Sequence, residues 1–558
     1  MIATNQKKES KKPIGKLLME KGLITESHIQ LALQEQKITK EKLGEVLERL
    51  TFVTQYDVAT TISEQEGIPY QDLDEIVPQE KVLKMFNKRI CLNNVFLPLS
   101  IEERTIKVAT GDVWKPNLSQ LIIRHTGLQL QFVLAERNKI INAINTHYYF
   151  LEHPVQTLIQ NEINMLVHDE DMVRGMDDLL KYLFHYAVKM RTTDIHIRPM
   201  ERSINIAFRL DGVLTTVLSL PPQVKRIVSS IKMKAEMDIA EQRLPQDGRF
   251  SASILNNEYD FRVSTIVSPY GENVVLRLLP KASSIIGMGQ LGFFDEDVSK
   301  VENMFDEPFG MVLLTGPTGS GKTTTLYAGV RSLDLLAKNV LTVENPIEYN
   351  VPLIRQTQVN EKAGYTFSNA IRNFLRHDPD IMLIGEIRDS ETAATAISAS
   401  VTGHLVLSTL HTNTAIGAIP RLRDLGIRSF LLADSLLGVV SQRLVRRICS
   451  NCKEEYEASY SEKKYLGEPD LTTLYRGKGC EVCNDRGYLG RTLVYEILTV
   501  DETIASLIDQ EVEMKDIAEA AKSSGFIDTF NVAVRKVKEG ITTVDEIVRV
   551  LGSVRRVG

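Results

Sequence analysis

Cysteine, tryptophan and surplus positive charge are all scarce in this sequence of 558 residues. It has five cysteines and one tryptophan, and 66 Lys plus Arg stand against 72 Asp plus Glu for a net charge of −6. An odd, small number of cysteines argues against the disulfide framework of a secreted scaffold. The negative charge disfavours a protein that coats nucleic acid by bulk charge. The sequence contains no uninterrupted run of about 18 apolar residues, the length that predicts a membrane-spanning helix.

The composition that remains is that of a globular protein. Hydrophobic residues make up 43% and charged residues 25%, and the length predicts about three or four domains. The opening segment, MIATNQKKESKKP, has lysines but no apolar stretch behind them, so it does not resemble a secretory signal. We therefore expect a cytoplasmic protein that reaches a membrane only through partners.

An internal repeat opens the chain. A shift of 29 residues aligns Ile14-Gly15 with Leu43-Gly44 and the segment at Leu23 with that at Phe52. Each copy reads as two short amphipathic helices, with Thr25 or Thr54 at the N-cap of the second. Beyond Gly67, short strand-like runs mixed with helices predict a small α/β domain. Residues 153–175 are polar and acidic and read as a linker.

The strongest chemical signal is an eight-residue glycine-rich segment that follows one strand and opens a helix. Such a loop wraps backbone N–H groups around a polyphosphate, while Lys322 reaches the β- and γ-phosphate oxygens and Thr323 offers its hydroxyl to Mg²⁺. The predicted nucleotide-binding residues are Gly316, Pro317, Thr318, Gly319, Ser320, Gly321, Lys322, Thr323 and Thr324. The strand–helix alternation around this loop predicts a parallel sheet.

Two further strands of this region end in carboxylates, and a third lies between histidines. Ile381 to Ile384 leads to Glu386, and Leu341 to Glu344 leads into Asn-Pro-Ile-Glu348. A P-loop needs an acidic residue for Mg²⁺ and a base for the attacking water, and both candidates fit. The strand Leu405 to Leu410 stands between His404 and His411, an arrangement that suits a γ-phosphate sensor.

These motifs together resemble the assembly ATPases of type II secretion and type IV pilus systems, the GspE/PilB family. The P-loop, an Asp box at residues 342–348, a Walker B stretch at 378–389 and a His box at 402–413 occur in the family's order. The resemblance implies that Glu344 activates the hydrolytic water, Glu386 holds Mg²⁺ through water and His411 reads the γ-phosphate. Asn345 stands where the family has Asp, which removes a charge beside the expected base.

The domain before the P-loop carries arginines that the resemblance places over the nucleotide. The family positions map onto Arg262 and Arg277, which lie in Arg262-Val-Ser-Thr and Gly-Glu-Asn-Val-Val-Leu-Arg277. A guanidinium stabilises charge on a transferring phosphoryl group when it arrives as an interface closes. The alternative for either arginine is a solvated charge on a sheet.

The other cysteines form two tight pairs, Cys449 with Cys452 and Cys480 with Cys483. Four thiolates from two Cys-x-x-Cys segments give a closed tetrahedral Zn²⁺ site, structural in kind because no coordination position stays open. A redox dithiol or two disulfides are the alternatives. Cys91 has no sequence partner and reads as a small buried apolar residue.

The N-terminal repeat resembles the tandem cyclic-di-GMP-binding motif of MshE-type pilus ATPases. Gly15, Gln36 and Gln65 match that motif, but Pro13 and Lys42 stand where it has arginine. An arginine fork grips phosphate or guanine edges, and neither Pro nor Lys replaces it fully. A helical docking domain for a membrane-anchored partner is therefore the favoured interpretation, with cyclic-di-GMP binding as the alternative.

We thus expect an α/β multidomain protein with a RecA-like P-loop ATPase domain, preceded by a PAS-like α+β domain and an N-terminal module. The expected parts are a helical repeat at 1–66, a small α/β domain at 67–150, a linker at 151–175, the arginine-bearing α+β domain at 176–283 and the ATPase domain at 284–558, with a zinc subdomain at about 445–492.

The resemblance implies a motor ATPase, peripheral at the inner membrane, that uses ATP, Mg²⁺ and Zn²⁺ to power assembly of a type II secretion pseudopilus or a type IV pilus. It implies a homo-hexamer that works on an inner-membrane platform protein and binds a membrane-anchored docking protein. The motifs are common to both machines. The alternatives are a DNA-uptake or DNA-translocation ATPase, a cyclic-di-GMP-regulated nucleotide switch and a small-molecule kinase; a single tryptophan and the negative net charge argue against nucleic-acid binding.

Overall fold

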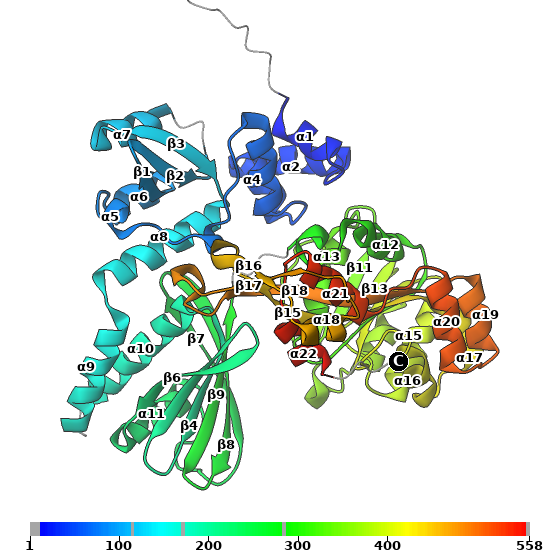
Figure 1. The fold of residues 1–558 in the computed structure, drawn as a ribbon. Coiled ribbons are helices and arrows are strands. Elements are labelled where there is room, and N and C mark those ends of the chain that lie inside the picture. Colours follow the sequence, from blue (N-terminus) through cyan, green and yellow to red (C-terminus); the bar gives the residue numbers. More distant parts are fainter. Residues whose placement is uncertain (1–11, 113–115, 169–172, 282–285, 554–558) are drawn as a thin grey trace, which may run out of the picture. The chain divides into compact units, whose positions relative to one another are not determined.

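The chain forms two units in the computed structural model, which describes residues 12–112, 116–168, 173–281 and 286–553 (Figure 1). The first unit combines Met1–Thr61 with Ser284–Gly558, and the second comprises Ile62–Ser283. None of the helices within the described ranges has both the length and the apolar composition that a bilayer-spanning segment needs. The expected α/β multidomain architecture is confirmed.

A seven-stranded sheet is the centre of the first unit. Its order is β12-β11-β13-β14-β10-β15-β18, and all neighbours are parallel except β15 and β18. The strands are β10 (Gly310–Thr315), β11 (Val340–Glu344), β12 (Arg355–Gln358), β13 (Ile381–Ile384), β14 (Leu405–Leu410), β15 (Leu436–Ile448) and β18 (Tyr488–Thr499). The predicted parallel sheet is confirmed, and the antiparallel strand β18 adds an edge.

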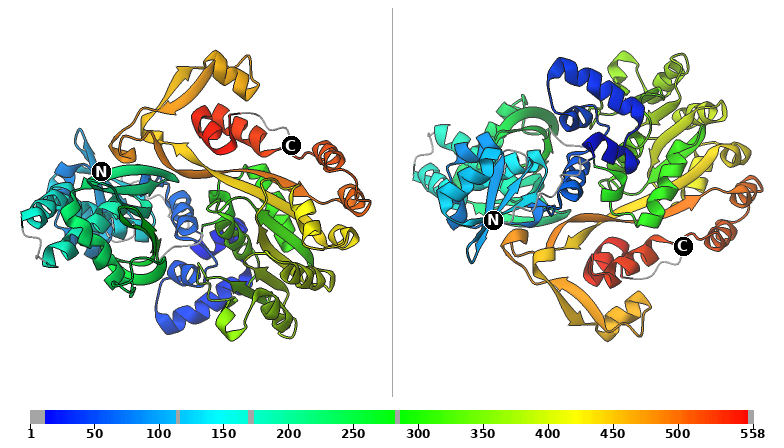
Figure 2. Two further views of the ribbon diagram at one scale, coloured as in Figure 1. Left: turned by 90° about the horizontal axis from the view of Figure 1, so that it is seen from below. Right: turned by 90° about the horizontal axis from the view of Figure 1, so that it is seen from above.

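Helices cover both faces of this sheet, as Figure 2 shows. Alternate residues of β10 belong to different cores: Met311 and Leu313 to one, Val312 and Leu314 to the other. A strand that is buried on both faces has a continuous run of apolar residues in its sequence, so β10 could be predicted from the sequence. One face carries α12 (Asp295–Asp306) and α13 (Lys322–Arg331); the other carries α14 (Phe367–Phe374), α15 (Ser390–Val401), α16 (Ala418–Asp424), α17 (Ser429–Ser435), α19 (Glu502–Asp509) and α20 (Met514–Ser523).

The N-terminal repeat folds into four helices, the last of which begins in the first unit and ends in the second. They are α1 (Ile14–Glu20), α2 (Glu26–Thr39), α3 (Leu43–Arg49) and α4 (Gln55–Glu66). Both predicted N-caps are present, because the Thr25 hydroxyl accepts from the His28 N–H at 3.4 Å and the Thr54 hydroxyl from the Asp57 N–H at 3.0 Å. Leu18, Val46 and Leu47 form the centre of the core that the two copies share.

A small hairpin and the C-terminal helices complete the first unit. The hairpin pairs β16 (Lys453–Glu457) with β17 (Thr473–Gly477) between the two cysteine pairs, and α18 (Tyr460–Leu466) connects its strands. Helices α21 (Thr529–Lys538) and α22 (Val544–Leu551) follow α20.

The second unit contains two sheets. The first has the order β1-β2-β3, with β1 (Phe96–Glu102), β2 (Thr105–Thr110) and β3 (Gln129–Leu134), and helices α5 (Glu80–Leu83), α6 (Lys88–Asn94), α7 (Pro116–Thr126) and α8 (Arg137–Glu152) accompany it. The second is fully antiparallel, ordered β6-β5-β4-β9-β8-β7, with β4 (Thr192–Pro199), β5 (Ile204–Leu210), β6 (Val213–Leu220), β7 (Gln246–Ile254), β8 (Asn257–Ser268) and β9 (Gly271–Pro280).

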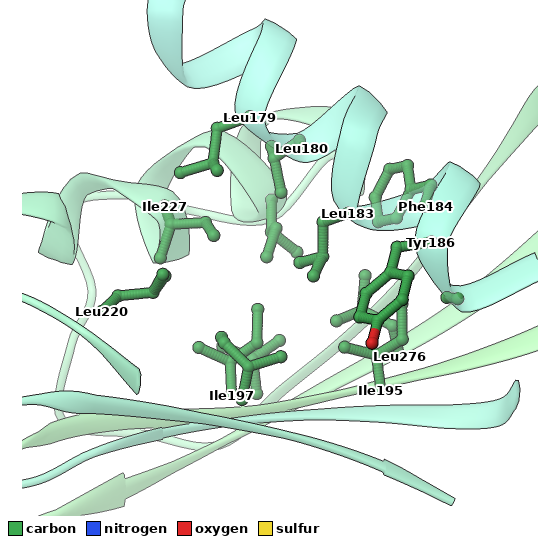
Figure 3. Packing of buried hydrophobic residues seen from close by; sticks show 14 of the residues in the cluster. Leu179, Leu180, Leu183, Phe184, Tyr186, Ile195, Ile197, Leu220, Ile227 and Leu276 are labelled. Atoms are coloured by element: carbon green, nitrogen blue, oxygen red, sulfur yellow. The ribbon is translucent and has the colours of Figure 1, made fainter. Parts of the chain in front are cut away.

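Helix α10 (Val173–Lys189) packs its apolar stripe on the second sheet, together with α11 (Ile227–Lys234). Figure 3 shows Leu180 and Leu183 of α10 directed toward Ile195 and Ile197 of β4. The range 151–175, predicted to be a linker, contains α9 (Val155–His168). Its Val155, Ile159, Ile163 and Leu166 are buried, and the helix packs against α10 and the turn at Pro222–Arg226. Apolar residues at helical spacing outweigh the acidic residues that follow them.

Candidate active site

The phosphate loop connects β10 to α13, as the sequence predicted. Gly316, Gly319 and Gly321 have φ angles of +138°, +77° and +90°, which L side chains adopt only with strain. At Gly316 a Cβ would also lie 2.3 Å from the carbonyl oxygen of Gln442 on β15, so glycine is required there. The loop thereby presents its backbone at the N-terminal end of α13, where N–H groups and the helix dipole favour an anion.

Lys322 opens α13 and is 9% exposed. Its ammonium group donates to the carbonyl oxygens of Gly316 at 2.9 Å and Pro317 at 3.2 Å, both within the phosphate loop. Burial lowers the pKa of Lys322, and the negative charge of Glu386 acts in the opposite direction. The ammonium group is thus held at the loop by weak neutral acceptors, which a phosphate oxygen can replace with a stronger charged partner.

Glu386 and His411 lie together at the same edge of the sheet. Glu386 follows β13 and His411 follows β14, so both stand at carboxyl ends of neighbouring parallel strands, where ligands of open α/β sheets bind. Glu386 Oε2 is 3.5 Å from His411 Nε2 and 2.6 Å from Arg388 Nε. The structure therefore brings Lys322, Glu386 and His411 to one place. His404 lies at the other end of β14, where its ring is bonded to the Ala399 carbonyl at 3.0 Å.

Glu344 ends β11 but is 3% exposed. Its Oε1 accepts from the Tyr327 hydroxyl at 2.5 Å, the Thr342 hydroxyl at 2.9 Å and the Gln356 amide at 3.4 Å. Burial raises the pKa of Glu344, and these donors partly oppose the rise. The sequence indicated the carboxylate but not its partners, since Tyr327 lies on α13 and Gln356 on β12. Its role as the base that activates water stays a prediction.

Thr323 and Thr324, the expected Mg²⁺ and nucleotide ligands, are both half-buried in the first turn of α13. The Thr324 hydroxyl lies 3.2 Å from the Tyr349 hydroxyl. Sequence reasoning missed Gln442, which is fully buried and donates from its amide to the Ser320 carbonyl at 2.9 Å. Gln442 belongs to no contiguous motif, so only the pairing of β10 with β15 reveals that it supports the loop.

The predicted arginines belong to the second unit. Arg262 on β8 is the cross-strand partner of Arg277 on β9, and the register continues to Arg249 on one side and to Asp194 and Arg209 on the other. Cross-strand partners project from the same face of a sheet, so four arginines and one aspartate form a row. Arg277 Nε is 3.0 Å from Asp194 Oδ1, and Arg209 Nε is 3.6 Å from Asp194 Oδ2. The action of Arg262 and Arg277 on nucleotide stays a prediction.

The two cysteine pairs converge as their spacing predicts. All four Sγ atoms lie within 4.8 Å of one another, and three of the separations are 3.7, 3.8 and 3.9 Å. A tetrahedral zinc with Zn–S bonds of about 2.3 Å sets its sulfurs about 3.8 Å apart, so the cluster fits that ion. The Cys480 and Gly487 backbone N–H groups and the Asn451 amide donate to these sulfurs at 3.2–3.3 Å, as donors around a thiolate site do.

Gly15 and Gln36, which matched the cyclic-di-GMP motif, and Gly44 of the second copy each contact a neighbouring part of the repeat. A Cβ on Gly15 would lie 3.2 Å from Ile29, and one on Gly44 would lie 3.4 Å from Val58. The Gln36 amide donates to the Glu41 carbonyl at 2.9 Å, which connects the two copies.

The helical repeat also contacts the far end of α13. Arg331, the last residue of that helix, donates to the Asp57 carboxylate at 2.7 Å and to the Thr51 carbonyl at 3.1 Å. His28 Nε2 lies 3.1 Å from Asp334 Oδ1. The helix that carries Lys322 at one end is therefore anchored in the N-terminal repeat at the other.

A family model described as "Type II/IV secretion system protein" matches residues 169–549, and one described as "MshEN domain" matches residues 66–153. The chain is 46% identical over 389 residues to the Type II secretion system protein E of Pseudomonas aeruginosa, covering 68% of this chain and 77% of that protein. It is 34% identical over 555 residues to the Type IV pilus assembly ATPase PilB of Myxococcus xanthus, covering 96% and 98%.

Among solved structures, the ATPase DotB of Legionella pneumophila matches with a TM-score of 0.50 and 19% identity, covering 67% of this chain and 95% of that one. At this identity the likeness concerns the fold alone.

Proposed function

The chain belongs to the Type II/IV secretion system protein family, and on this basis we propose that it is the motor that powers assembly of a type II secretion pseudopilus or a type IV pilus at the inner membrane. Relatives of this family, the pilus assembly ATPase PilB among them, are named as ATPases, and ATP hydrolysis is the activity of this chain. The observation that carries the proposal is the convergence of Lys322, Glu386 and His411 beside the phosphate loop in a chain of this family.

Within this proposal each site residue has one task. Lys322 holds the β- and γ-phosphate oxygens once it leaves its loop carbonyls, and Thr323 and Glu386 would hold Mg²⁺. Bound Mg²⁺ neutralises charge that develops on the phosphoryl oxygens. Glu344 accepts the proton of the attacking water, and His411 distinguishes ATP from ADP through the γ-phosphate. Arg262 and Arg277 would supply positive charge to the transferring phosphoryl group.

Cys449, Cys452, Cys480 and Cys483 would hold a structural zinc ion, which crosslinks the two ends of the hairpin segment. We further propose that the protein acts as a hexamer on an inner-membrane platform protein, in the cytoplasm and peripheral to the membrane. In this arrangement the N-terminal helical repeat docks to a membrane-anchored partner. Cyclic-di-GMP is the alternative ligand of the repeat, and titration calorimetry with that dinucleotide separates the two roles.

ATP turnover of the wild type and of Lys322→Ala, with and without the cytoplasmic part of a platform protein, tests the motor proposal. We expect the variant to lose at least about a hundredfold in kcat, because the charge that stabilises the transferring phosphoryl group is removed. We expect the platform fragment to stimulate only the wild type. Unchanged turnover in Lys322→Ala, or stimulation by DNA in place of the platform fragment, would contradict the proposal.

A further inference from the structure

The loop that follows His411 is fastened to the strand that leads into the phosphate loop. The Thr412 N–H donates to the Thr315 hydroxyl at 2.8 Å, and the hydroxyls of these two threonines are 2.7 Å apart. Thr315 is the last residue of β10 and is fully buried. The start of the loop at 412–415 therefore has a fixed position relative to Gly316.

The end of this loop is held by a buried carboxylate, Glu496, which lies three residues before the end of β18. Glu496 is 4% exposed, and its Oε1 accepts from the Ala415 N–H at 2.6 Å. Its Oε2 accepts from the Thr529 N–H at 3.2 Å and from the Thr529 hydroxyl at 2.9 Å. Thr529 is the first residue of α21, so one carboxylate connects the loop behind His411 to a C-terminal helix.

The burial of Glu496 lowers the stability of the fold, which suggests that the carboxylate is kept for another role. Within the described part of the chain its oxygens form no ion pair with a lysine, arginine or histidine, and three hydrogen bonds alone satisfy them. Burial is the main influence on the pKa of Glu496 and raises it. A buried charge without a countercharge lowers stability relative to an apolar residue.

A second connection runs in parallel through Arg443 on β15. Its guanidinium donates to the Asn413 side-chain oxygen at 3.3 Å and to the Val550 carbonyl of α22 at 3.1 Å. The Ser441 hydroxyl donates to the Asn413 carbonyl at 3.4 Å. Both C-terminal helices, α21 and α22, are thus tied to the same four-residue loop.

We propose that Glu496 is a positioning residue for ATP hydrolysis. It fixes the loop at 412–415, keeps His411 beside Glu386 and couples that position to α21, with Arg443 as the parallel connection to α22. The inference rests on the proposed role of His411 as the γ-phosphate sensor. Because the loop is held at both ends, it moves together with the residues that hold it. A change in the position of His411 after loss of the γ-phosphate therefore displaces the start of α21.

Substitution Glu496→Gln tests the proposal, because it keeps the size of the side chain but turns an amide N–H₂ toward one of the N–H donors. We expect kcat to fall about tenfold to a hundredfold, as for other small displacements of catalytic groups, with ADP affinity within about twofold of wild type. The decisive readout is the ratio of the dissociation constants for ADP and a non-hydrolysable ATP analogue. We expect this ratio to approach that of His411→Ala.

A double-mutant cycle makes the coupling measurable. If Glu496 acts through His411, His411→Ala/Glu496→Gln shows the same ratio as His411→Ala alone, whereas independent effects would multiply. Thr529→Val, which removes only the hydroxyl donor on the α21 side, should shift the ratio in the same direction by less. Thr529→Val can therefore replace Glu496→Gln in this test if the latter variant folds poorly.

Glu272→Gln is the matched control. Glu272 on β9 of the second unit is also a buried carboxylate, but it accepts from Lys232 Nζ at 2.9 Å and belongs to neither α21, α22 nor the loop at 412–415. It should lower the melting temperature and leave the ADP to ATP-analogue ratio unchanged.

The outcomes separate the inference from its premise. If His411→Ala lowers the ratio and Glu496→Gln lowers only the melting temperature, Glu496 is merely structural and the inference is overturned. If His411→Ala leaves the ratio unchanged, the sensor role fails and the positioning role falls with it. A lowered ratio in both single variants, with no further loss in the double variant, supports both.

Discussion

The phosphate-loop site and the four-cysteine site lie in the same unit but hold their polar groups in opposite ways. The cysteine sulfurs already have separations that suit a tetrahedral ion, with N–H donors around them. At the phosphate loop, Lys322 is bonded to carbonyls of its own loop, and the His411 side chain is 45% exposed. A structural site needs its ligand geometry complete, whereas a catalytic site needs groups whose present partners can be exchanged.

The largest expected effect comes from breaking the complete site. Removal of zinc with a chelator, or Cys452→Ser, should unfold the segment around residues 445–492, since structural zinc contributes about 10–16 kcal/mol of apparent binding energy in small zinc domains. We expect about one zinc ion per chain in the wild type, and rapid proteolysis within this segment after its removal. Metal analysis and limited proteolysis check both points.

Cys91→Ser is the control for this experiment. Cys91 is also buried, with its sulfur 3.3 Å from the Tyr148 hydroxyl, but it lies in the second unit and outside the four-cysteine cluster. It should keep the zinc content of the wild type. A Cys452→Ser protein with unchanged metal content and unchanged proteolysis would contradict the zinc assignment.

A smaller effect is expected at the far end of α13, where an ion pair, like the cysteine cluster, already has its partners in place. The side chains of Arg331 and Asp57 are 9% and 14% exposed and lie 2.7 Å apart. Arg331→Met leaves the half-buried Asp57 without its countercharge. Breaking a fully buried pair costs about 3–5 kcal/mol, so we expect a loss at the lower end of this range. We expect faster hydrogen exchange in α1 to α4, because their anchor on the ATPase domain is lost.

The matched control is Arg535→Met, which removes an exposed pair with Glu296 whose side chains are 45% and 54% exposed. Exposed pairs contribute about 0–1 kcal/mol, so the exchange of α1 to α4 should not change. Equal behaviour of the two variants would show that the Arg331 pair does not anchor the repeat.

The same contrast explains how much the sequence could predict. Residues that act within one contiguous motif, such as Lys322 or Cys449 and Cys452, are visible because their spacing reflects local geometry. Tyr327, Gln442 and Glu496 were missed, since each reaches its partner through strand pairing or helix packing across more than 15 residues. The row of arginines can be recognised only once the register of β7, β8 and β9 is known. Helix α9 was not predicted because acidic residues follow it directly.

The smallest and most specific effect is expected at Glu344, a buried carboxylate near the phosphate loop whose hydrogen bonds are satisfied by protein donors. Burial raises its pKa, and Tyr327 donates the shortest of its hydrogen bonds. Tyr327→Phe removes that donor and should raise the pKa further. A carboxylate with a raised pKa destabilises the folded protein as pH rises through that pKa, so the variant should lose about 1.5–3 kcal/mol at neutral pH and less near pH 5.

The pH dependence of kcat then tests whether Glu344 is the base. A base must be ionised, so the acid limb of the profile follows its pKa and should move to higher pH in Tyr327→Phe. Tyr495→Phe is the control, because Tyr495 is equally buried in the same unit but donates to Asp297, away from the site. It should lose stability without moving the limb. If Tyr327→Phe also leaves the limb in place, Glu344 is not the base, and the exposed Glu348 of the same motif becomes the carboxylate to substitute.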